Sequence, residues 1–124
     1  MGARFIQVSA VYFLIGVVVG LVMGIAEAFQ YTSAHAHINL LGWASLAIVG
    51  VIYSIYPEAG KTKLANAQFW LHNIGLPLLI VSMILFANGV IGVGIPLASI
   101  GGLLVIASVV LFLINAFRNV KARA

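Results

Sequence analysis

Residues 5–29 read FIQVSAVYFLIGVVVGLVMGIAEAF, and the only charged side chain among them is Glu27. A helix that crosses a membrane needs about 20 mostly apolar residues. The stretch is long enough, so it predicts a membrane-spanning helix. It is also longer than the apolar core of a signal peptide, which has about 7–15 residues. We therefore expect it to be kept as the first helix of the protein.

Three further stretches of similar character follow along the chain. They cover residues 34–56, 64–87 and 91–117. The segments between them are short, which favours antiparallel neighbours in a bundle. Residues 57–63 form the only sizeable polar linker, and the pair Asn88-Gly89 marks a turn before the last stretch. The sequence thus predicts one all-α domain over residues 1–124, an integral membrane four-helix bundle.

The composition points to the same class of protein. Of 124 residues, 64% are hydrophobic and 6% are charged, with a mean hydropathy of +1.21. A soluble domain carries about 25% charged residues, so a soluble enzyme, a nucleic-acid-binding protein and a disordered chain are excluded. Cysteine is absent, which excludes thiolate metal sites, iron–sulfur clusters, disulfides and covalent c-type haem attachment.

The basic residues predict the orientation in the membrane. They precede the first helix, lie between the second and third, and follow the fourth: Arg4, Lys61, Lys63, Arg118, Lys121 and Arg123. With four spans these regions share one side, and Lys and Arg favour the cytoplasmic side. We expect both termini inside, in a bacterial inner membrane and in contact with its lipids. The net charge of +4 then needs no nucleic-acid partner.

Small residues recur along one face of the first predicted helix. Gly16, Gly20 and Gly24 are spaced by four, and Ala28 follows. This small-xxx-small spacing lets another helix approach closely. The sequence leaves open whether that helix belongs to the same chain or to a second subunit.

Ionisable groups within a membrane are costly and mark functional sites. The candidates here are Glu27, His35, His37 and His72, because Glu58 lies in the basic linker beside two lysines. Glu27 falls near the depth of the first two histidines. It can orient an imidazole or exchange protons there, or it can simply face the wet interface.

His35 and His37 open the second predicted helix near the outer surface, and Asn39 follows. Residues two apart on a helix are separated by about 200°, so the two imidazoles point to opposite faces. This geometry suits two haem pockets, one on each side. A single copper or zinc site with Glu27 needs a non-helical start to the segment. We take both histidines as candidate metal ligands and Asn39 as a cofactor-binding residue; an interfacial hydrogen-bonded pair is the alternative.

His72 is a fourth candidate cofactor-binding residue. By helix rise it lies roughly 12 Å above the inner end of the third helix, whereas His37 lies about 5 Å below the outer end of the second. The two are too far apart in depth to share one iron. A deeper second site, a proton path and a structural hydrogen bond all remain open for His72. Pro77 should kink the same helix, because it offers no N–H to residue 73.

Two motifs in succession resemble the catalytic subunit of the haem-copper oxidase superfamily, most closely its nitric oxide reductase branch. The residues that carry the resemblance are His35-Ala36-His37 with Leu40-Leu41-Gly42, then Phe69-Trp70, Asn73 and Gly75. In that family one histidine of the first motif ligates a high-spin haem and the other a low-spin haem. The resemblance implies haem b, with its iron, as the cofactor of this chain and a respiratory redox partner.

The resemblance also has gaps. The family's catalytic subunit has twelve helices in three arcs of four, and this chain has only four. It lacks the adjacent histidines that hold the non-haem metal, so a complete binuclear site is missing and no catalytic residue is assigned. Three copies would rebuild the ring, with His35 of one copy facing His37 of the next around a threefold axis. Such a homotrimer would serve electron transfer, haem handling or the binding of a diatomic gas.

Two other classes of function compete with haem binding. A small proton-coupled transporter would rely on a carboxylate in the first helix, and Glu27 is the only one there. Its place at the helix end counts against this class, because transporter sites lie near the midplane. An accessory subunit of a respiratory complex fits the glycines and the few charges, but it leaves His35 and His37 unexplained.

Overall fold

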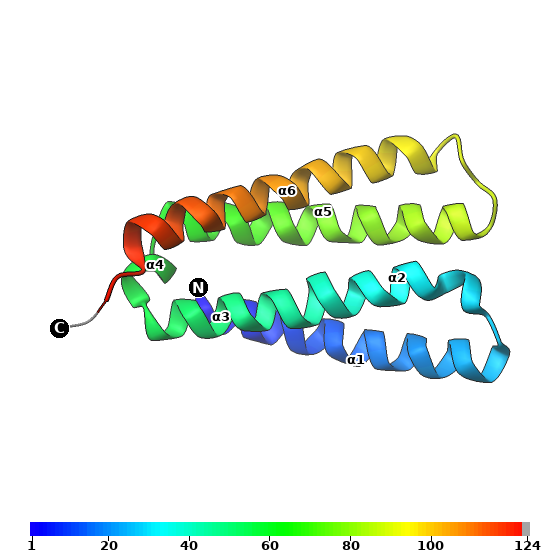
Figure 1. Cartoon of the computed structure of the whole chain (residues 1–124), viewed down its shortest axis with the longest axis horizontal. Helices are drawn as coiled ribbons and strands as arrows, with labels where there is room; N and C mark the ends of the chain where they lie inside the picture. The colour runs from blue at the N-terminus through cyan, green and yellow to red at the C-terminus, as the bar shows by residue number, and fades with distance from the viewer. Residues whose placement is uncertain (123–124) are drawn as a thin grey trace.

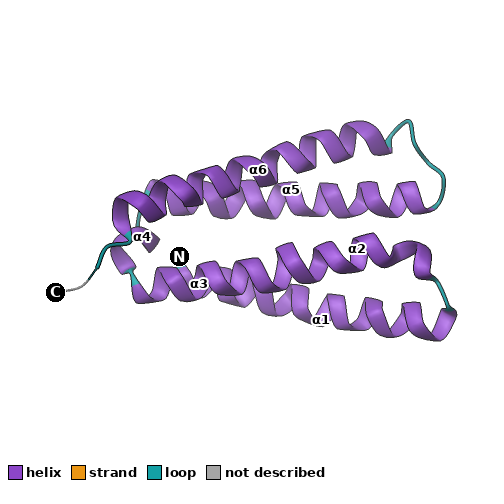
Figure 2. Cartoon of the chain, viewed as in Figure 1, coloured by secondary structure: helices purple, strands orange, loops and turns teal. Residues whose placement is uncertain are grey.

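The computed structural model describes residues 1–122, and all regular structure within them is helical (Figure 2). In chain order the elements are α1 (Gly2–Ala26), the 3₁₀ turn η1 (Phe29–Tyr31), α2 (Thr32–His37), the π-helical segment η2 (Ile38–Ala44), α3 (Ser45–Ile55), α4 (Pro57–Gly60), α5 (Lys63–Ala87) and α6 (Gly94–Asn119). Four helical stretches are long and apolar enough to span a membrane, with η1 to α3 forming one of them. The prediction of four spanning helices is confirmed.

The helix ends follow local backbone chemistry. α1 stops at Ala26 rather than at residue 29, because Glu27 adopts a left-handed conformation (φ 52°, ψ 35°). The N–H of Ala28 then closes the end on the carbonyl of Met23 at 3.0 Å. The last helix begins at Gly94 rather than at residue 91, after a turn in which Gly89 has a φ of 78°.

The polar linker is itself partly helical. Pro57 occupies the first turn of α4, where its missing N–H costs nothing. Thr62 then caps α5, since its Oγ1 accepts a hydrogen bond from the N–H of Ala65 at 3.1 Å. The chain therefore reverses between α3 and α5 within a short linker of which only Tyr56, Lys61 and Thr62 lie outside a helix.

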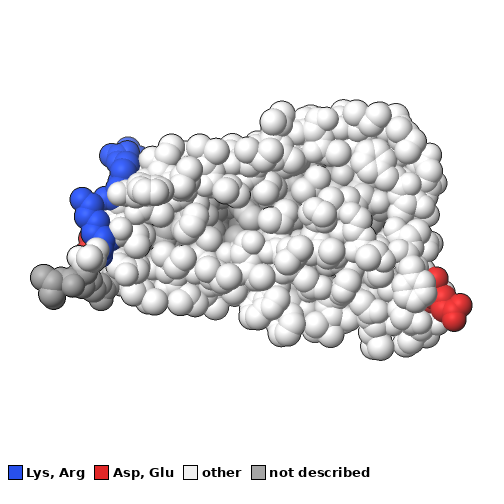
Figure 3. Space-filling model, in the orientation of Figure 1, with Lys and Arg blue, Asp and Glu red and all other residues white. Residues whose placement is uncertain are grey.

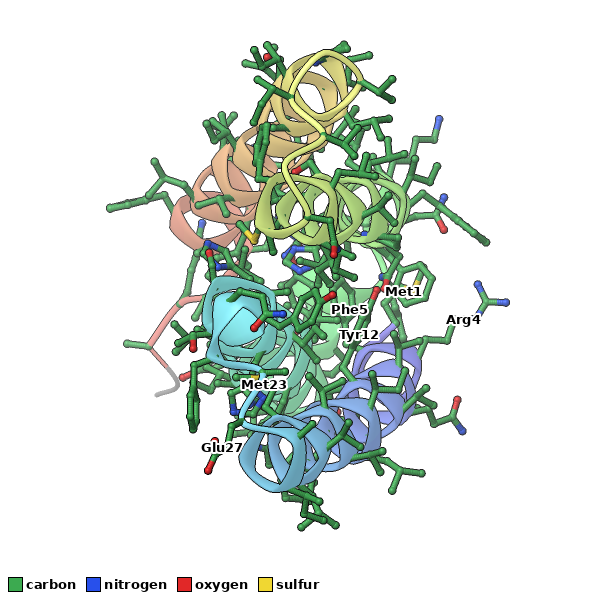
Figure 4. All side chains as sticks on the ribbon, turned by 90° about the vertical axis from the view of Figure 1, so that its right-hand side faces the viewer. Met1, Arg4, Phe5, Tyr12, Met23 and Glu27 are labelled. Atoms are coloured by element: carbon green, nitrogen blue, oxygen red, sulfur yellow. The ribbon has the colours of Figure 1, made fainter. Side chains whose placement is uncertain are left out.

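The helices form two hairpins that lie side by side (Figure 1). α1 packs against η2 and α3, and α5 packs against α6 along its length. At the end with the turns after α1 and α5, α6, α5, α2 and α1 follow one another in a row (Figure 4). At this end the four helices therefore lie in a row and do not surround a common axis.

The backbones of α5 and α6 touch at two glycines. A Cβ atom on Gly101 would lie 2.7 Å from the carbonyl oxygen of Gly75 and 2.7 Å from the backbone nitrogen of Leu79. Both glycines are buried. Small residues at this crossing therefore set the distance between the two helices of the second hairpin.

An aromatic cluster joins the hairpins at the opposite end. Phe5 packs edge-on against Tyr53 and Phe69, with ring centroids 5.4 and 5.2 Å apart. Tyr53 also meets Phe112 at 5.9 Å. One residue from each of α1, α3, α5 and α6 takes part, so this cluster holds all four long helices together.

Charge divides the molecule into two ends. Lys and Arg side chains gather at the end that holds the N-terminus, α4 and the last turn of α6 (Figure 3). Arg123, one of the basic residues of the prediction, lies outside the described residues. The flanks between the two ends are uncharged and expose large side chains such as Leu14 and Leu103, each 66% exposed. The chain is an integral membrane protein, and which end faces the cytoplasm remains a prediction.

Candidate functional site

The two neighbouring histidines sit where the second spanning helix changes its winding. Both lie in α2, and the π-helical segment η2 begins at the next residue. π-helical turns are rare and occur frequently at functional sites. Within η2, the backbone carbonyl of Leu40 accepts two hydrogen bonds from Ser45. One comes from the backbone N–H and the other, at 2.6 Å, from the hydroxyl group.

His35 fills a hollow on α1. A Cβ atom on Gly20 would lie 2.8 Å from its Cε1 atom, and the amide nitrogen of Asn39 lies 3.3–3.4 Å from its ring nitrogens. Asn39 in turn occupies the space over Gly16, whereas nothing lies within 4 Å of the same position on Gly24. Of the three evenly spaced glycines on α1, which we call the glycine stripe, Gly16 and Gly20 thus contact side chains of the same chain.

This packing predicts opposite effects for two neighbouring turns of α1. Gly20→Ala should destabilise the protein by about 1 kcal/mol or more, because the added methyl group displaces the ring of His35. Gly24→Ala should be neutral or slightly stabilising, since alanine favours a helix over glycine by up to about 1 kcal/mol. Unfolding in mixed micelles, followed by circular dichroism, measures both. Equal effects of the two substitutions on stability would show that Gly20 does not make room for the ring of His35.

His37 is held in one ring orientation by the backbone. Its Nδ1 lies 2.9 Å from the carbonyl oxygen of Ser33, which can only accept, so Nδ1 carries the proton. Nε2 then holds the lone pair, and it makes no hydrogen bond to any residue within 1–122. A bond from Nδ1–H to a carbonyl is the usual way in which proteins fix a metal-binding imidazole.

The α-helical geometry of α2 decides between the metal alternatives. Because both histidines are helical, they point about 200° apart, as expected. The non-helical start that a shared copper or zinc site requires is not present. Within residues 1–122 no group of three His, Asp or Glu side chains could hold a metal ion. The described structure therefore does not bring His35, His37 and Glu27 together as one copper or zinc site.

Glu27 does not join the histidines. It is exposed at the end of α1 and lies at the edge of the molecule in Figure 4. Its carboxylate makes no hydrogen bond to another residue of the described chain. Glu27 therefore lies at the end of a helix and not within a spanning segment. This position counts against a transporter, which would need a carboxylate near the midplane of the membrane.

The backbone of Glu27 is strained, and this gives a second prediction. The left-handed conformation costs a non-glycine residue about 1 kcal/mol or more. Glu27→Gly should therefore leave the fold intact and stabilise it by up to about 1 kcal/mol. The matched change Gly89→Ala, at the other positive φ, should destabilise by a similar amount. Thermal unfolding in detergent checks both signs, and a loss of stability in Glu27→Gly would show that the carboxylate has a role.

His72 is tied into the helix contacts on both sides of its ring. It is 3% exposed, its Nε2 lies 2.8 Å from the carbonyl of Leu41 in η2, and its Nδ1 lies 3.2 Å from the hydroxyl of Ser108 in α6. The carbonyl of Leu41 in η2 thus accepts a hydrogen bond from a side chain of α5. The arrangement favours the structural hydrogen bond among the alternatives for this residue.

Sequence reasoning did not find the partners of His72. Ser108 and Leu41 are unremarkable in sequence, and only the crossing of three helices brings them to the ring. The available signal for Ser108 was a serine in the middle of an apolar stretch, residues 100–114.

Comparison with known proteins gives a distant relative. The chain is 30% identical over 99 residues to the Cbb3-type cytochrome c oxidase subunit CcoN1 of Stutzerimonas stutzeri, a match that covers 70% of this chain. It spans only 20% of the length of that relative. No family model matches the chain, and no solved structure matches it. The similarity agrees with the resemblance to haem-copper oxidase subunits and indicates a redox-related membrane protein.

Proposed function

We propose that this chain binds haem b in the membrane and that His37 is an axial ligand of the iron. The observation that carries the proposal is the ring geometry of His37, with Nδ1–H on the carbonyl of Ser33 and Nε2 without a partner among the described residues. Similarity to an oxidase subunit supports haem as the group that such an imidazole would bind.

The surroundings of His37 fit an apolar macrocycle. The ring is half-buried, and Leu40, one turn further along, is 61% exposed. The spanning stretch that contains His37, Phe29–Ile55, has no charged residue. An apolar ring system can therefore approach Nε2 without burying a charge.

The second ligand is assigned to another copy of the chain. In the proposed homotrimer, His35 of one copy faces His37 of the next, and each interface holds one haem. In the isolated chain His35 lies in the hollow over Gly20, so the trimer requires its side chain to turn out of this hollow or α1 to shift. Asn39, which contacts His35, is then its companion in the cofactor pocket.

The number of imidazoles on the iron decides between the possible roles. A bound haem b supplies one-electron transfer when both axial positions are filled, and an open position for a diatomic gas when one is free. His37 with a partner's His35 favours electron transfer or haem handling. His37 alone would favour gas binding, because one position on the iron would stay open.

A reduced-minus-oxidised visible spectrum of the detergent-purified protein tests the proposal, with a pyridine haemochrome assay for stoichiometry. Sharp α and β bands, at about one haem b per chain, are expected for six-coordinate iron. His35→Ala should broaden these bands and leave a five-coordinate haem on His37. A protein that stays colourless after reconstitution with haem would overturn haem binding.

The oligomer needs its own measurement. The mass of the haem-loaded protein in native mass spectrometry should correspond to three chains. A haem-loaded monomer would contradict the trimer while leaving His37 as a ligand in place.

A further inference from the structure

A hollow of about 600 Å³ lies beside the last turn of α6, at the end of the molecule where Lys and Arg gather (Figure 3). Its polar lining comes from the linker after α3 and from the end of α6, and consists of Tyr56, Glu58, Arg118, Asn119 and Lys121. Sites for small ligands usually have volumes of about 300–1,000 Å³, so the hollow is large enough to be one. Because the spanning helix α6 ends at Asn119, the hollow lies near one surface of the membrane.

The charged side chains that line this hollow are not paired with one another. Arg118 and Lys121 carry positive charge, Glu58 carries negative charge, and all three are exposed. None of them makes an ion pair or a hydrogen bond with another residue of the described part of the chain. Each of them can therefore bind a charged group of a ligand without first breaking a contact inside the protein.

The hollow suits a ligand that carries both signs of charge. Arg118 and Lys121 suit a phosphate group, because a guanidinium group binds phosphate oxygens through two parallel hydrogen bonds. Glu58 would repel a ligand that carries only negative charge. The last carbonyl groups of α6 lack donors within the helix, and they favour a cation as well. A molecule that combines a phosphate group with an ammonium group meets both requirements.

An apolar groove lies on the same turn of α6. Its lining residues, Ala116, Phe117 and Val120, are interleaved in sequence with Arg118 and Lys121 of the hollow. The ring of Phe117 is 82% exposed, as expected for a side chain that faces lipid. A molecule bound here can thus place a charged group in the hollow and an acyl chain against Phe117.

We propose that this end of the protein binds an aminophospholipid of the phosphatidylethanolamine type. The phosphate group lies against Arg118 and Lys121. The ammonium group lies against Glu58, and one acyl chain lies against Phe117. Basic residues at the ends of spanning helices attract anionic lipids in general, but the unpaired carboxylate among them favours a headgroup with an ammonium group. The hollow lies at the end opposite to α2, so the proposal is independent of the proposed haem site (Figure 1).

Native mass spectrometry of the detergent-purified chain tests the proposal, after incubation with equal amounts of phosphatidylethanolamine and phosphatidylcholine that have the same acyl chains. The two headgroups have the same net charge, and only the first has N–H donors for Glu58. We expect the protein to retain phosphatidylethanolamine about fivefold more, the effect of one partly exposed ion pair. Glu58→Gln should abolish this preference. Glu27→Gln, which removes an exposed carboxylate at the other end, should keep it.

The phosphate contact has its own pair of variants. Arg118→Gln should lower the retention of both lipids severalfold, because both carry the phosphate group. Lys63→Gln removes an exposed basic residue that does not line the hollow, and it should leave the retention of both lipids unchanged. Circular dichroism establishes that each variant is folded.

Four results would overturn the proposal. The first is equal retention of the two lipids by the wild-type protein, a comparison that needs no variant to fold. The second is a preference that persists in folded Glu58→Gln. Stronger retention of phosphatidylglycerol than of phosphatidylethanolamine would show a general attraction for anions instead. Displacement of the lipid by an equal concentration of soluble phosphoethanolamine would show a site for free phosphate esters and not for a lipid.

Discussion

Gly101→Leu should prevent the second hairpin from forming. The backbones of α5 and α6 touch at this point, and a Cβ atom would already lie 2.7 Å from the carbonyl of Gly75. Neither neighbour is a flexible side-chain end, so the helices must separate to admit a leucine. We expect a loss of at least about 3 kcal/mol, the upper part of the usual range for overpacking.

Gly102→Leu is the matched control for this change. Nothing lies within 4 Å of a Cβ atom at Gly102, although the residue is adjacent in sequence. Its substitution should change stability by no more than about 0.5 kcal/mol, as for a surface position. Yield of monodisperse protein and unfolding in mixed micelles measure both variants. Similar behaviour of the two would show that α5 and α6 do not cross as described.

His37→Ala should remove most of the Soret absorption of the haem-loaded protein, because the remaining ligand, the partner's His35, must leave its hollow over Gly20 to reach the iron. The change removes the only Nε2 that is both oriented by the backbone and without a partner among residues 1–122. His37→Gly should behave alike, and added imidazole should restore the band by taking the place of the missing ring. Absorption spectra at a fixed ratio of haem to protein measure the loss and the rescue.

Ser33→Ala provides the control on the same face of α2. It removes a hydroxyl that contacts Met83 at 3.6 Å and keeps the backbone carbonyl that orients His37. Haem content should therefore be unchanged. If His37→Ala retains its full Soret band, the axial ligand lies elsewhere and the proposed function loses its basis.

The spanning helices were predictable because a bilayer imposes a length and an apolar composition on them. Details that depend on one backbone angle were not, such as the end of α1 at Glu27. Sequence periodicity also gave the opposed directions of His35 and His37. It did not indicate the π-helical winding of η2, nor that Leu41 within this segment meets His72 of α5.

The glycine stripe is a second case in which the sequence predicted a contact but not the residues that make it. Its spacing predicts close approach, and Gly16 and Gly20 do receive side chains of the second helix. The identity of those side chains was not predictable, because spacing on one helix says nothing of the register of its neighbour. His35 and Asn39 thus emerged as packing partners of α1 only in three dimensions.

The division into two hairpins bears on how the protein is made. The turns that connect α1 with α2 and α5 with α6 contain one charged side chain between them, that of Glu27. In the predicted orientation, with both termini inside, each pair of helices has little charge to carry across a bilayer during insertion. The first pair can leave the ribosome and enter the membrane before α5 is synthesised, and the Phe5–Phe69 contact forms only when the second pair arrives. The aromatic cluster, which joins the first pair of helices to the second, can then form only after both pairs have been inserted.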